Sequence, residues 1–373
     1  MAGIYIHIPF CRKACYYCNF HFSVSQKLLP QTINAIAHEM ILRHEYLNEK
    51  IETVYFGGGT PSLLQPGDIN LLMDKVFSIF DVEPGAEITL EANPDDITAH
   101  KLSAWKNMGI NRLSIGTQSF LEADLQWMNR AHNAQQAYDS IKLAIQNGFT
   151  NISTDFIYGT PNLTNEQWLQ NLETANELNI PHLSCYALTV EPNTALKKMI
   201  DLHKKEDVDA AKQSIQFELL MQWAADKGYE HYEISNFAKP GFRSRHNSSY
   251  WQGKHYLGLG PSAHSFNGNE RQWNISNNAL YIESLNKNIV PFEKEELSST
   301  QKINEYLMTA LRTNEGIVLY QLELLSGKEI TAAIIRDANR FIQQHLLERK
   351  NDALILTSKG KLFADGIAAD LFR

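Results

Sequence analysis

Three cysteines lie within eight residues near the amino terminus, as Cys11, Cys15 and Cys18. They follow an apolar run, residues 4–10, that has the composition of a β-strand. Cysteine thiolates bind zinc, copper(I) or iron-sulfur clusters. A four-iron cluster normally takes four cysteines, but the remaining cysteine, Cys185, lies far along the chain. We therefore expect the three clustered cysteines to hold a 4Fe-4S cluster and to leave one iron open to a small molecule.

Three other interpretations of the cysteines stay open at this stage. Buried free thiols behave as small apolar side chains, although polar Arg12 and Lys13 between the first two cysteines favour a loop around a metal. Structural zinc needs a fourth ligand, for which His7 or His21 is available. Disulfide bonds are the least favoured, because four cysteines in 373 residues without a secretory signal indicate a reducing compartment.

Composition and charge narrow the class of protein. The chain has 43% hydrophobic and 20% charged residues, which is enough for a substantial folded core. Its net charge of -8 argues against a nucleic acid partner, because phosphate backbones bind basic surfaces. No stretch reaches the ~20 apolar residues of a membrane-spanning helix, and the first ten residues lack the features of a secretory signal. We expect a cytoplasmic protein, with peripheral membrane contact left open.

Apolar runs and helical patterns alternate along the first half of the chain. Six short strands separated by helices predict a parallel sheet with right-handed crossovers. Six units are too few for a closed eight-stranded barrel. The predicted strands are residues 4–10, 53–56, 87–91, 112–115, 153–157 and 182–189, and the predicted helices are residues 31–47, 68–80, 99–108, 122–147 and 166–178.

Polar and glycine residues recur at the carboxyl ends of these predicted strands. The cysteine loop follows the first strand, residues 57–59 (GGG) follow the second, and Glu91, Gln118 and Asp155 lie at or after the ends of later ones. Ligands of α/β folds bind at this edge of the sheet. We therefore expect these residues to share one site.

The second half of the chain has a different pattern. Residues 230–269 contain short strands and turns rich in glycine, serine, asparagine and aromatic residues, and we place a substrate region here. Helical patterns at residues 301–312 and 332–347, followed by a strand and turn, predict a small α+β carboxyl-terminal domain of winged-helix kind. The predicted units are a core of residues 1–229, a substrate region of residues 230–298 and a carboxyl-terminal domain of residues 299–373.

The cysteine motif CxxxCxxC after a first strand resembles the signature of the radical S-adenosylmethionine (SAM) superfamily. Together with residues 54–62 (VYFGGGTPS) and 90–94 (LEANP), it is similar to the oxygen-independent coproporphyrinogen III oxidase group, over essentially the whole chain. The resemblance implies a partial, open (β/α)6 barrel in which SAM chelates the open iron. It also implies an electron donor, because one electron from the reduced cluster cleaves SAM to a 5'-deoxyadenosyl radical.

The resemblance further implies which residues contact SAM. The backbone at Gly58, Gly59 and Thr60 would meet the SAM ammonium group, and Glu91 the ribose hydroxyls. Arg130 suits the SAM carboxylate, because guanidinium binds carboxylate bidentately. Without the resemblance, a glycine turn or a buried polar side chain more often has a structural role. The other implied SAM contacts are Tyr5, Tyr17, Gln118 and Asp155.

Two features separate the branches of this group. The oxidases usually carry a further cysteine two residues after the third, together with an amino-terminal extension, whereas this chain has Phe20 and ten residues before Cys11. Residues 246–251 (HNSSYW) are similar to the HNxxYW element of haem chaperones. Histidine is a common axial haem ligand, and aromatic rings offer flat faces to a porphyrin. The haem contacts implied by this resemblance are His246, Asn247, Tyr250 and Trp251.

Three functions follow as alternatives. The first is a haem chaperone that passes haem to apo-haemoproteins. The second is an oxidase that decarboxylates coproporphyrinogen III to protoporphyrinogen IX, and the third is a zinc-stabilised interaction module. No catalytic residue is assigned. Further candidates for the porphyrin are Arg243 and Arg245 at its propionates and His255 and His264 as axial ligands.

Overall fold

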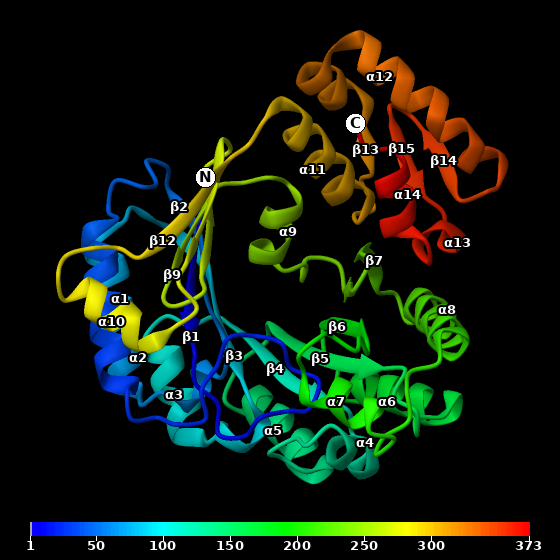
Figure 1. Cartoon of the computed structure of the whole chain (residues 1–373). Coiled ribbons are helices and arrows are strands. Elements are labelled where there is room, and N and C mark those ends of the chain that lie inside the picture. The colour runs from blue at the N-terminus through cyan, green and yellow to red at the C-terminus, as the bar shows by residue number, and fades with distance from the viewer. Residues whose placement is uncertain (1) are drawn as a thin grey trace.

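The computed structural model describes residues 2–373. Six parallel strands curve into an open barrel, and helices cover its outer side (Figure 1). This confirms the predicted partial (β/α)6 architecture. The strands are β1 (Ala2–Ile8), β2 (Ile51–Gly58), β3 (Val82–Ala92), β4 (Arg112–Gln118), β5 (Ile152–Tyr158) and β6 (His182–Ala187). The helices are α1 (Leu29–Leu42), α2 (Pro66–Ile79), α3 (Ala99–Asn107), α4 (Glu122–Trp127), α5 (Ala134–Gln146), α6 (Asn165–Glu177), α7 (Ala195–Asp201) and α8 (Ala210–Asp226).

Alternation along the strands separates an apolar outer face from a polar interior. In β1, Ile4, Ile6 and Ile8 are fully buried in the main hydrophobic core, beneath the helices. The residues between them, Tyr5 and His7, point to the inside of the barrel, where their rings lie 5.9 Å apart. The sheet is therefore stabilised from outside, and its interior is free to carry polar groups.

Strands from residues 230–296 extend both edges of the barrel. The full sheet has 12 strands in the order β12-β11-β10-β9-β1-β2-β3-β4-β5-β6-β8-β7. The predicted short strands therefore form, but they join the main sheet, and the predicted boundary at residue 230 stays a prediction. The added strands are β7 (Glu230–Glu233) and β8 (Asn236–Ala238) at one edge, and β9 (Tyr256–Leu259), β10 (His264–Phe266), β11 (Glu270–Asn274) and β12 (Phe292–Glu296) at the other.

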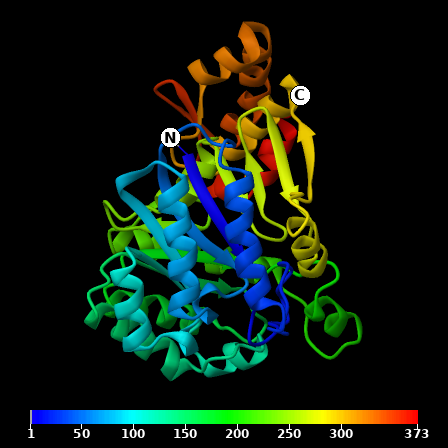
Figure 2. The same ribbon diagram turned by 90° about the vertical axis from the view of Figure 1, so that its left-hand side faces the viewer.

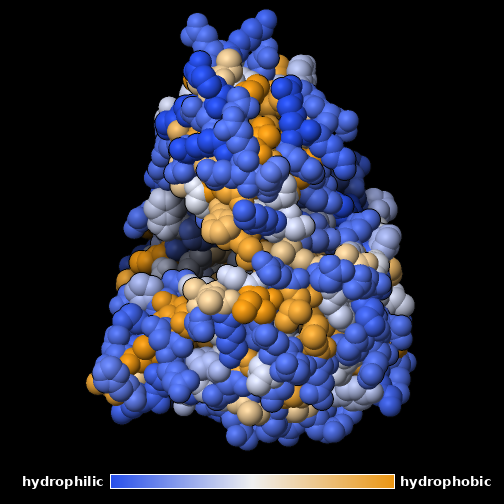
Figure 3. Space-filling model, turned by 90° about the vertical axis from the view of Figure 1, so that its right-hand side faces the viewer, coloured by the Kyte–Doolittle hydropathy of each residue, from blue (hydrophilic) through white to orange (hydrophobic). Residues whose placement is uncertain are grey.

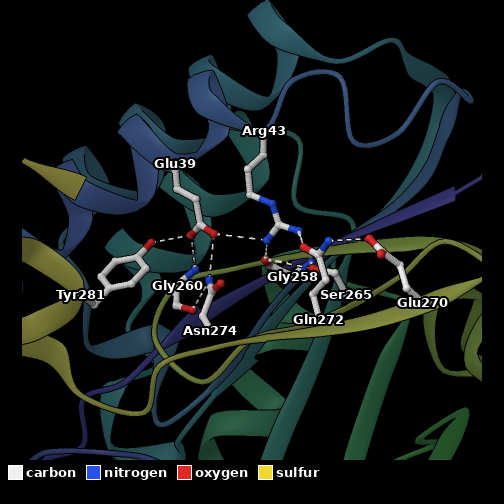
Figure 4. Close-up of polar contacts among 9 residues, drawn as sticks. All are labelled: Glu39, Arg43, Gly258, Gly260, Ser265, Glu270, Gln272, Asn274 and Tyr281. Carbon is white, nitrogen blue, oxygen red and sulfur yellow. Dashed lines mark hydrogen bonds and ion pairs between the residues drawn. The ribbon is translucent and has the colours of Figure 1, made fainter. Parts of the chain in front are cut away.

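A buried network fastens this extension to α1 (Figure 4). Glu39 of α1 accepts hydrogen bonds from the Tyr281 hydroxyl at 2.5 Å and from the Gly260 amide at 2.8 Å. The side-chain amide of Asn274 donates to it at 2.8 Å. Tyr281 belongs to α10 (Asn278–Leu285). A buried carboxyl group is tolerated when its oxygens are bonded in this way.

Arg43 completes the network one turn after Glu39 (Figure 4). Its guanidinium lies 3.3 Å from the Glu39 carboxylate and donates to Gln272 at 2.6 Å. It also donates to the Gly258 carbonyl at 3.2 Å. α1 ends at Leu42, earlier than the predicted residue 47. Arg43 follows directly, and its side chain points into the sheet extension.

The carboxyl-terminal residues form a second, smaller hydrophobic core. Figures 1 and 2 place this unit at the end of the barrel where β1 begins. It has a three-stranded sheet in the order β13-β15-β14, which confirms the predicted α+β domain. Among residues 2–373, no helix combines the length and hydrophobicity needed to cross a membrane. The elements are α11 (Ser299–Leu311), β13 (Ile317–Val318), α12 (Leu319–Gln343), β14 (Leu347–Lys350), β15 (Ala353–Leu356), α13 (Ser358–Lys361) and α14 (Ala364–Asp370).

Candidate functional site

The carboxyl ends of the barrel strands surround a cavity of about 360 Å³. The loop after β1 brings all three clustered cysteines to its wall, and the glycine turn after β2 forms another side. The structure thus gathers residues that are far apart in the sequence. The predicted SAM contacts on the cavity wall are Tyr17, Gly58, Gly59, Thr60, Glu91, Gln118, Arg130 and Asp155.

The cysteines lie in surroundings that suit a cluster. Thr60 donates a hydrogen bond to Cys11 Sγ at 3.4 Å, and Arg130 Nη1 lies 3.3 Å from Cys15 Sγ. Burial raises the pKa of Cys11 to about 11, and burial also raises the pKa of Cys18. These thiols therefore need a cationic partner, such as iron, to become thiolates.

Cys11, Cys15 and Cys18 line one cavity and suit a 4Fe-4S cluster as a ligand set. Each thiolate would bind a different iron of such a cluster. Among residues 2–373, no three His, Cys, Asp or Glu side chains form a group that could hold one metal ion. The zinc interpretation, which needs four ligands around one ion, stays a prediction.

The glycine turn approaches the cavity closely because it has no side chains. Gly58 has a φ of 105°, and a β-carbon there would lie 2.6 Å from the His7 ring. The Gly58 amide donates to Glu91 Oε2 at 3.2 Å. A β-carbon on Gly59 would lie 2.7 Å from the carbonyl oxygen of Phe10. A side chain at either position would push the turn away from its neighbours, so glycine is required for the turn to stay in contact with the cysteine loop.

Two carboxyl groups with raised pKa values line the cavity. Glu91 Oε1 accepts a hydrogen bond from the Tyr55 hydroxyl at 2.7 Å, and burial raises the pKa of Glu91 to about 8. Asp155 accepts from Ser114 at 3.2 Å, and burial raises the pKa of Asp155 to about 6. Both groups can accept hydrogen bonds from a polar ligand, and perturbed carboxyl groups in a cleft are typical of functional sites.

Arg130 is held beside the cysteines with one donor free. Its guanidinium donates to Asn93 Oδ1 and to the Gly116 carbonyl, each at 2.8 Å. Its Nη1 also lies 3.3 Å from the Tyr17 hydroxyl. Its Nε is buried and has no hydrogen-bond partner among the described residues. A ligand oxygen in the cavity would reach that nitrogen only if the guanidinium turned toward it.

Tyr5 is the one predicted SAM contact that the structure does not bring to the cavity wall. Its ring stacks on Tyr55 with centroids 6.0 Å apart, and its hydroxyl lies 3.1 Å from His7 Nδ1. Tyr5 pairs with Tyr55 across the strands, one layer deeper in the barrel than Gly57. Tyr55 and Asn93 were not predicted as site residues, although both belong to the motifs that carried the resemblance.

The predicted haem contacts lie at the opposite end of the barrel, on α9 (Arg245–Trp251). His246 is 1% exposed, with Nδ1 at 2.8 Å from Thr53 Oγ1 and Nε2 at 2.9 Å from the Tyr250 hydroxyl. Both ring nitrogens of His246 are therefore hydrogen-bonded within the chain in this conformation. The haem roles of His246, Asn247, Tyr250 and Trp251 stay predictions.

The two arginines suggested for haem propionates are engaged within the chain. Arg243 pairs with Glu230 at 3.0 Å and with Glu315 at 2.8 Å. Arg245 donates to the Gly85 carbonyl at 3.1 Å. In this conformation both side chains therefore bind groups of the protein itself.

Comparisons with known proteins agree with this geometry. Residues 5–175 match the radical SAM superfamily, and residues 297–363 match the HemN C-terminal domain. The haem chaperone HemW of Bacillus subtilis is 30% identical, over 98% of this chain and 98% of the relative. HemW of Escherichia coli is 32% identical, over 98% of this chain and 96% of the relative. The structure of coproporphyrinogen III oxidase (HemN) from Escherichia coli has the same fold, with a TM-score of 0.86 at 22% identity over 100% of this chain and 90% of that one.

The barrel, the cysteine loop and the superfamily match define a radical SAM protein, a class whose cofactors are a 4Fe-4S cluster and SAM. The sequence matches to the HemW relatives extend over nearly the full length of those proteins. The chain belongs to the haem chaperone HemW family. The resemblance identified from the sequence motifs is therefore confirmed.

Proposed function

We propose that the chain is a haem chaperone that binds a 4Fe-4S cluster, SAM and haem and transfers haem to acceptor haemoproteins. The relatives that carry this name are 30% to 33% identical to it. The observation that carries the proposal is the shared cavity, in which three cysteines face a glycine turn, an arginine and two carboxyl groups.

Cys11, Cys15 and Cys18 are the proposed cluster ligands. A cluster held by these cysteines would lie at the cavity that Gly58 and Gly59 also line, where an open iron could take SAM. When bound, the reduced cluster supplies the electron that cleaves the SAM carbon-sulfur bond. The protein's own part is to orient SAM and to keep water from the reacting atoms.

The cavity offers complementary groups to each polar part of SAM. The guanidinium of Arg130 on the cavity wall suits the carboxylate. Asn93 connects it with Thr60, which donates to Cys11. Glu91 suits the ribose hydroxyls. The proposed supporting contacts to SAM are Tyr17, Gln118 and Asp155.

Haem needs a wide apolar surface, because a porphyrin is flat and large. Figure 3 shows a hollow between the carboxyl-terminal domain and the barrel, with hydrophobic residues along its margin. Aromatic Phe20 and Tyr186 of the cavity wall are 65% and 43% exposed. Aromatic rings such as these offer flat apolar faces to a porphyrin.

His246, His264 and His255 are the three candidates for the axial haem ligand. His246 is closed off by Thr53 and Tyr250, so haem binding there requires α9 to move. His264 on β10 is exposed, and its ring lies 6.2 Å from that of Trp273. Haem titration of His246→Ala and His264→Ala, with His255→Ala as a third variant, identifies the ligand.

One anaerobically reconstituted preparation tests the function. We expect four irons per chain, a SAM-dependent change in the cluster spectrum, and haem binding followed by transfer to an apo-haemoprotein in the presence of an electron donor. Turnover of coproporphyrinogen III would instead identify an oxidase. One zinc per chain without iron would identify an interaction module.

A further inference from the structure

We propose that His246 is a positioning residue for SAM, which acts through Tyr55 on Glu91 across the interior of the barrel. The inference rests on the SAM site proposed above. It assigns to α9 a task at the SAM site, although α9 lies at the opposite end of the strands from the cysteines. It also assigns to His246 a role other than the haem ligation implied by the sequence resemblance.

Tyr55 connects the two ends of this path. On one side its ring stacks on His246, with centroids 4.8 Å apart and planes at 21°. On the other side it stacks on Tyr5, with centroids 6.0 Å apart and planes at 24°. At its tip, the hydroxyl donates to Glu91 Oε1 at 2.7 Å. The two flanking rings therefore fix the direction in which Tyr55 presents its hydroxyl.

His246 has a single orientation in the structure. Its two ring nitrogens are bonded to Thr53 and Tyr250, and its backbone amide donates to Glu87 Oε1 at 3.0 Å. Burial lowers the pKa of His246 to about 3, so the ring is neutral near pH 7. A neutral, doubly bonded imidazole is a rigid support for the tyrosine ring.

Two glycines leave room for this stack. A β-carbon at Gly57 would lie 2.8 Å from the Tyr55 ring, 2.9 Å from Tyr5 and 3.1 Å from Glu91 Oε1. A β-carbon at Gly3 would lie 2.8 Å from Thr53 Oγ1, the partner of His246 Nδ1. A side chain at Gly57 would displace the rings, and one at Gly3 would disturb the hydrogen bond that orients His246.

The other face of α9 contacts the carboxyl-terminal domain. Arg312, which follows α11, lies over the Trp251 ring at 5.0 Å and pairs with Glu233 at 2.9 Å. α9 is thus held between the barrel interior and that domain.

SAM affinity measured at several pH values tests the inference. In the reconstituted holoprotein, His246→Ala should raise the SAM Kd about tenfold, the effect of losing one well-placed hydrogen bond at Glu91. The midpoint of the pH dependence should also move to higher pH, because the bond from Tyr55 lowers the pKa of Glu91. His246→Phe keeps a ring against Tyr55 and should restore most of the affinity.

His231→Ala is the matched control. Its ring also stacks on an aromatic neighbour, Phe237, at 4.1 Å, but its nitrogens bond to Ile234 and Lys361 and not to the stack around Tyr55. Should His246→Ala prove unstable, Tyr55→Phe gives the second test, with the same expected change in Kd and midpoint. Iron content should equal that of the wild-type chain in every variant.

Two results would overturn the inference. The first is an unchanged SAM Kd and midpoint in His246→Ala, with haem affinity lost, which would make His246 a haem ligand. The second is an equal loss of SAM affinity in His231→Ala, which would reduce the effect to general stability. A wild-type chain that carries the cluster and fails to bind SAM would contradict the proposed function itself, so the two failures are distinguishable.

Discussion

The hydroxyl of Tyr55 donates to the carboxyl group of Glu91 at 2.7 Å, inside a barrel whose outer face is apolar. This contact connects Tyr55, in the interior of the barrel, with Glu91 on the wall of the cavity that the cysteines line. It also places a titratable group with a pKa of about 8 where a ribose is expected.

SAM affinity should increase as the pH rises through about 8. Below that value Glu91 is protonated and accepts hydrogen bonds poorly, whereas above it the carboxylate accepts them well. Equilibrium dialysis of SAM against the holoprotein measures the effect. In Glu91→Gln the pH dependence should disappear, and a variant that kept the wild-type profile would remove Glu91 from the site.

The same pKa has a consequence for stability. The pKa of Glu91 is higher in the folded chain, about 8, than the value of about 4.3 expected in the unfolded chain. Its contribution to the free energy of unfolding is therefore greatest at low pH and is lost as the pH rises towards 8. Urea titration of the cluster-free chain at pH 9 should show Glu91→Gln more stable than the wild type, and a less stable variant would contradict the assignment.

Arg130→Lys should weaken SAM binding by roughly tenfold or more, equivalent to about 1.4 kcal/mol. Lysine has no planar fork, so it cannot hold Asn93 and Gly116 while offering a further donor to SAM. Iron content and SAM Kd together check this result. A normal Kd would show that the guanidinium is not used by the ligand.

Gly57→Ala should lower SAM affinity without loss of the 4Fe-4S cluster. The added β-carbon would meet Tyr55, Tyr5 and Glu91 within 3.1 Å, and these side chains must then shift. Gly67→Ala is the control, because a β-carbon there meets no atom within 4 Å. Equal SAM Kd values for the two variants would show that the space around Gly57 is unimportant.

Tyr281→Phe should destabilise the chain by about 1.5–3 kcal/mol, the usual contribution of a hydrogen bond to a charged group. The phenol hydroxyl donates to Glu39, which is fully buried and paired with Arg43. Urea denaturation measures the free energy of unfolding. Tyr320→Phe, at an exposed side chain, is the control and should leave it unchanged.

Local sequence patterns predicted the parallel sheet and the edge at which the site lies, and the family resemblance implied the open barrel. Parallel strands end at one edge, so the cysteine loop, Gly58, Glu91 and Asp155 had to converge once the strands were recognised. The alternation in β1 also follows from sequence, since Ile4 and Ile6 face the helices.

Other features depend on contacts between distant segments and were not predictable locally. The pairing of β9 with β1 carries α9 to the amino ends of the strands, so His246 and Trp251 lie away from the cysteines. Tyr5 faces inwards as alternation requires, but its depth in the barrel is set by its pairing with Tyr55. The network around Glu39 joins residues more than 200 positions apart.

The most direct measurement is electron-nuclear double resonance of the reduced cluster with SAM labelled at its amino nitrogen. If Cys11, Cys15 and Cys18 hold a 4Fe-4S cluster with one open iron, the labelled nitrogen should couple to the cluster spins, and the coupling should vanish when any of the three is replaced by Ala. A cluster that forms in the wild-type chain without such coupling would contradict the account.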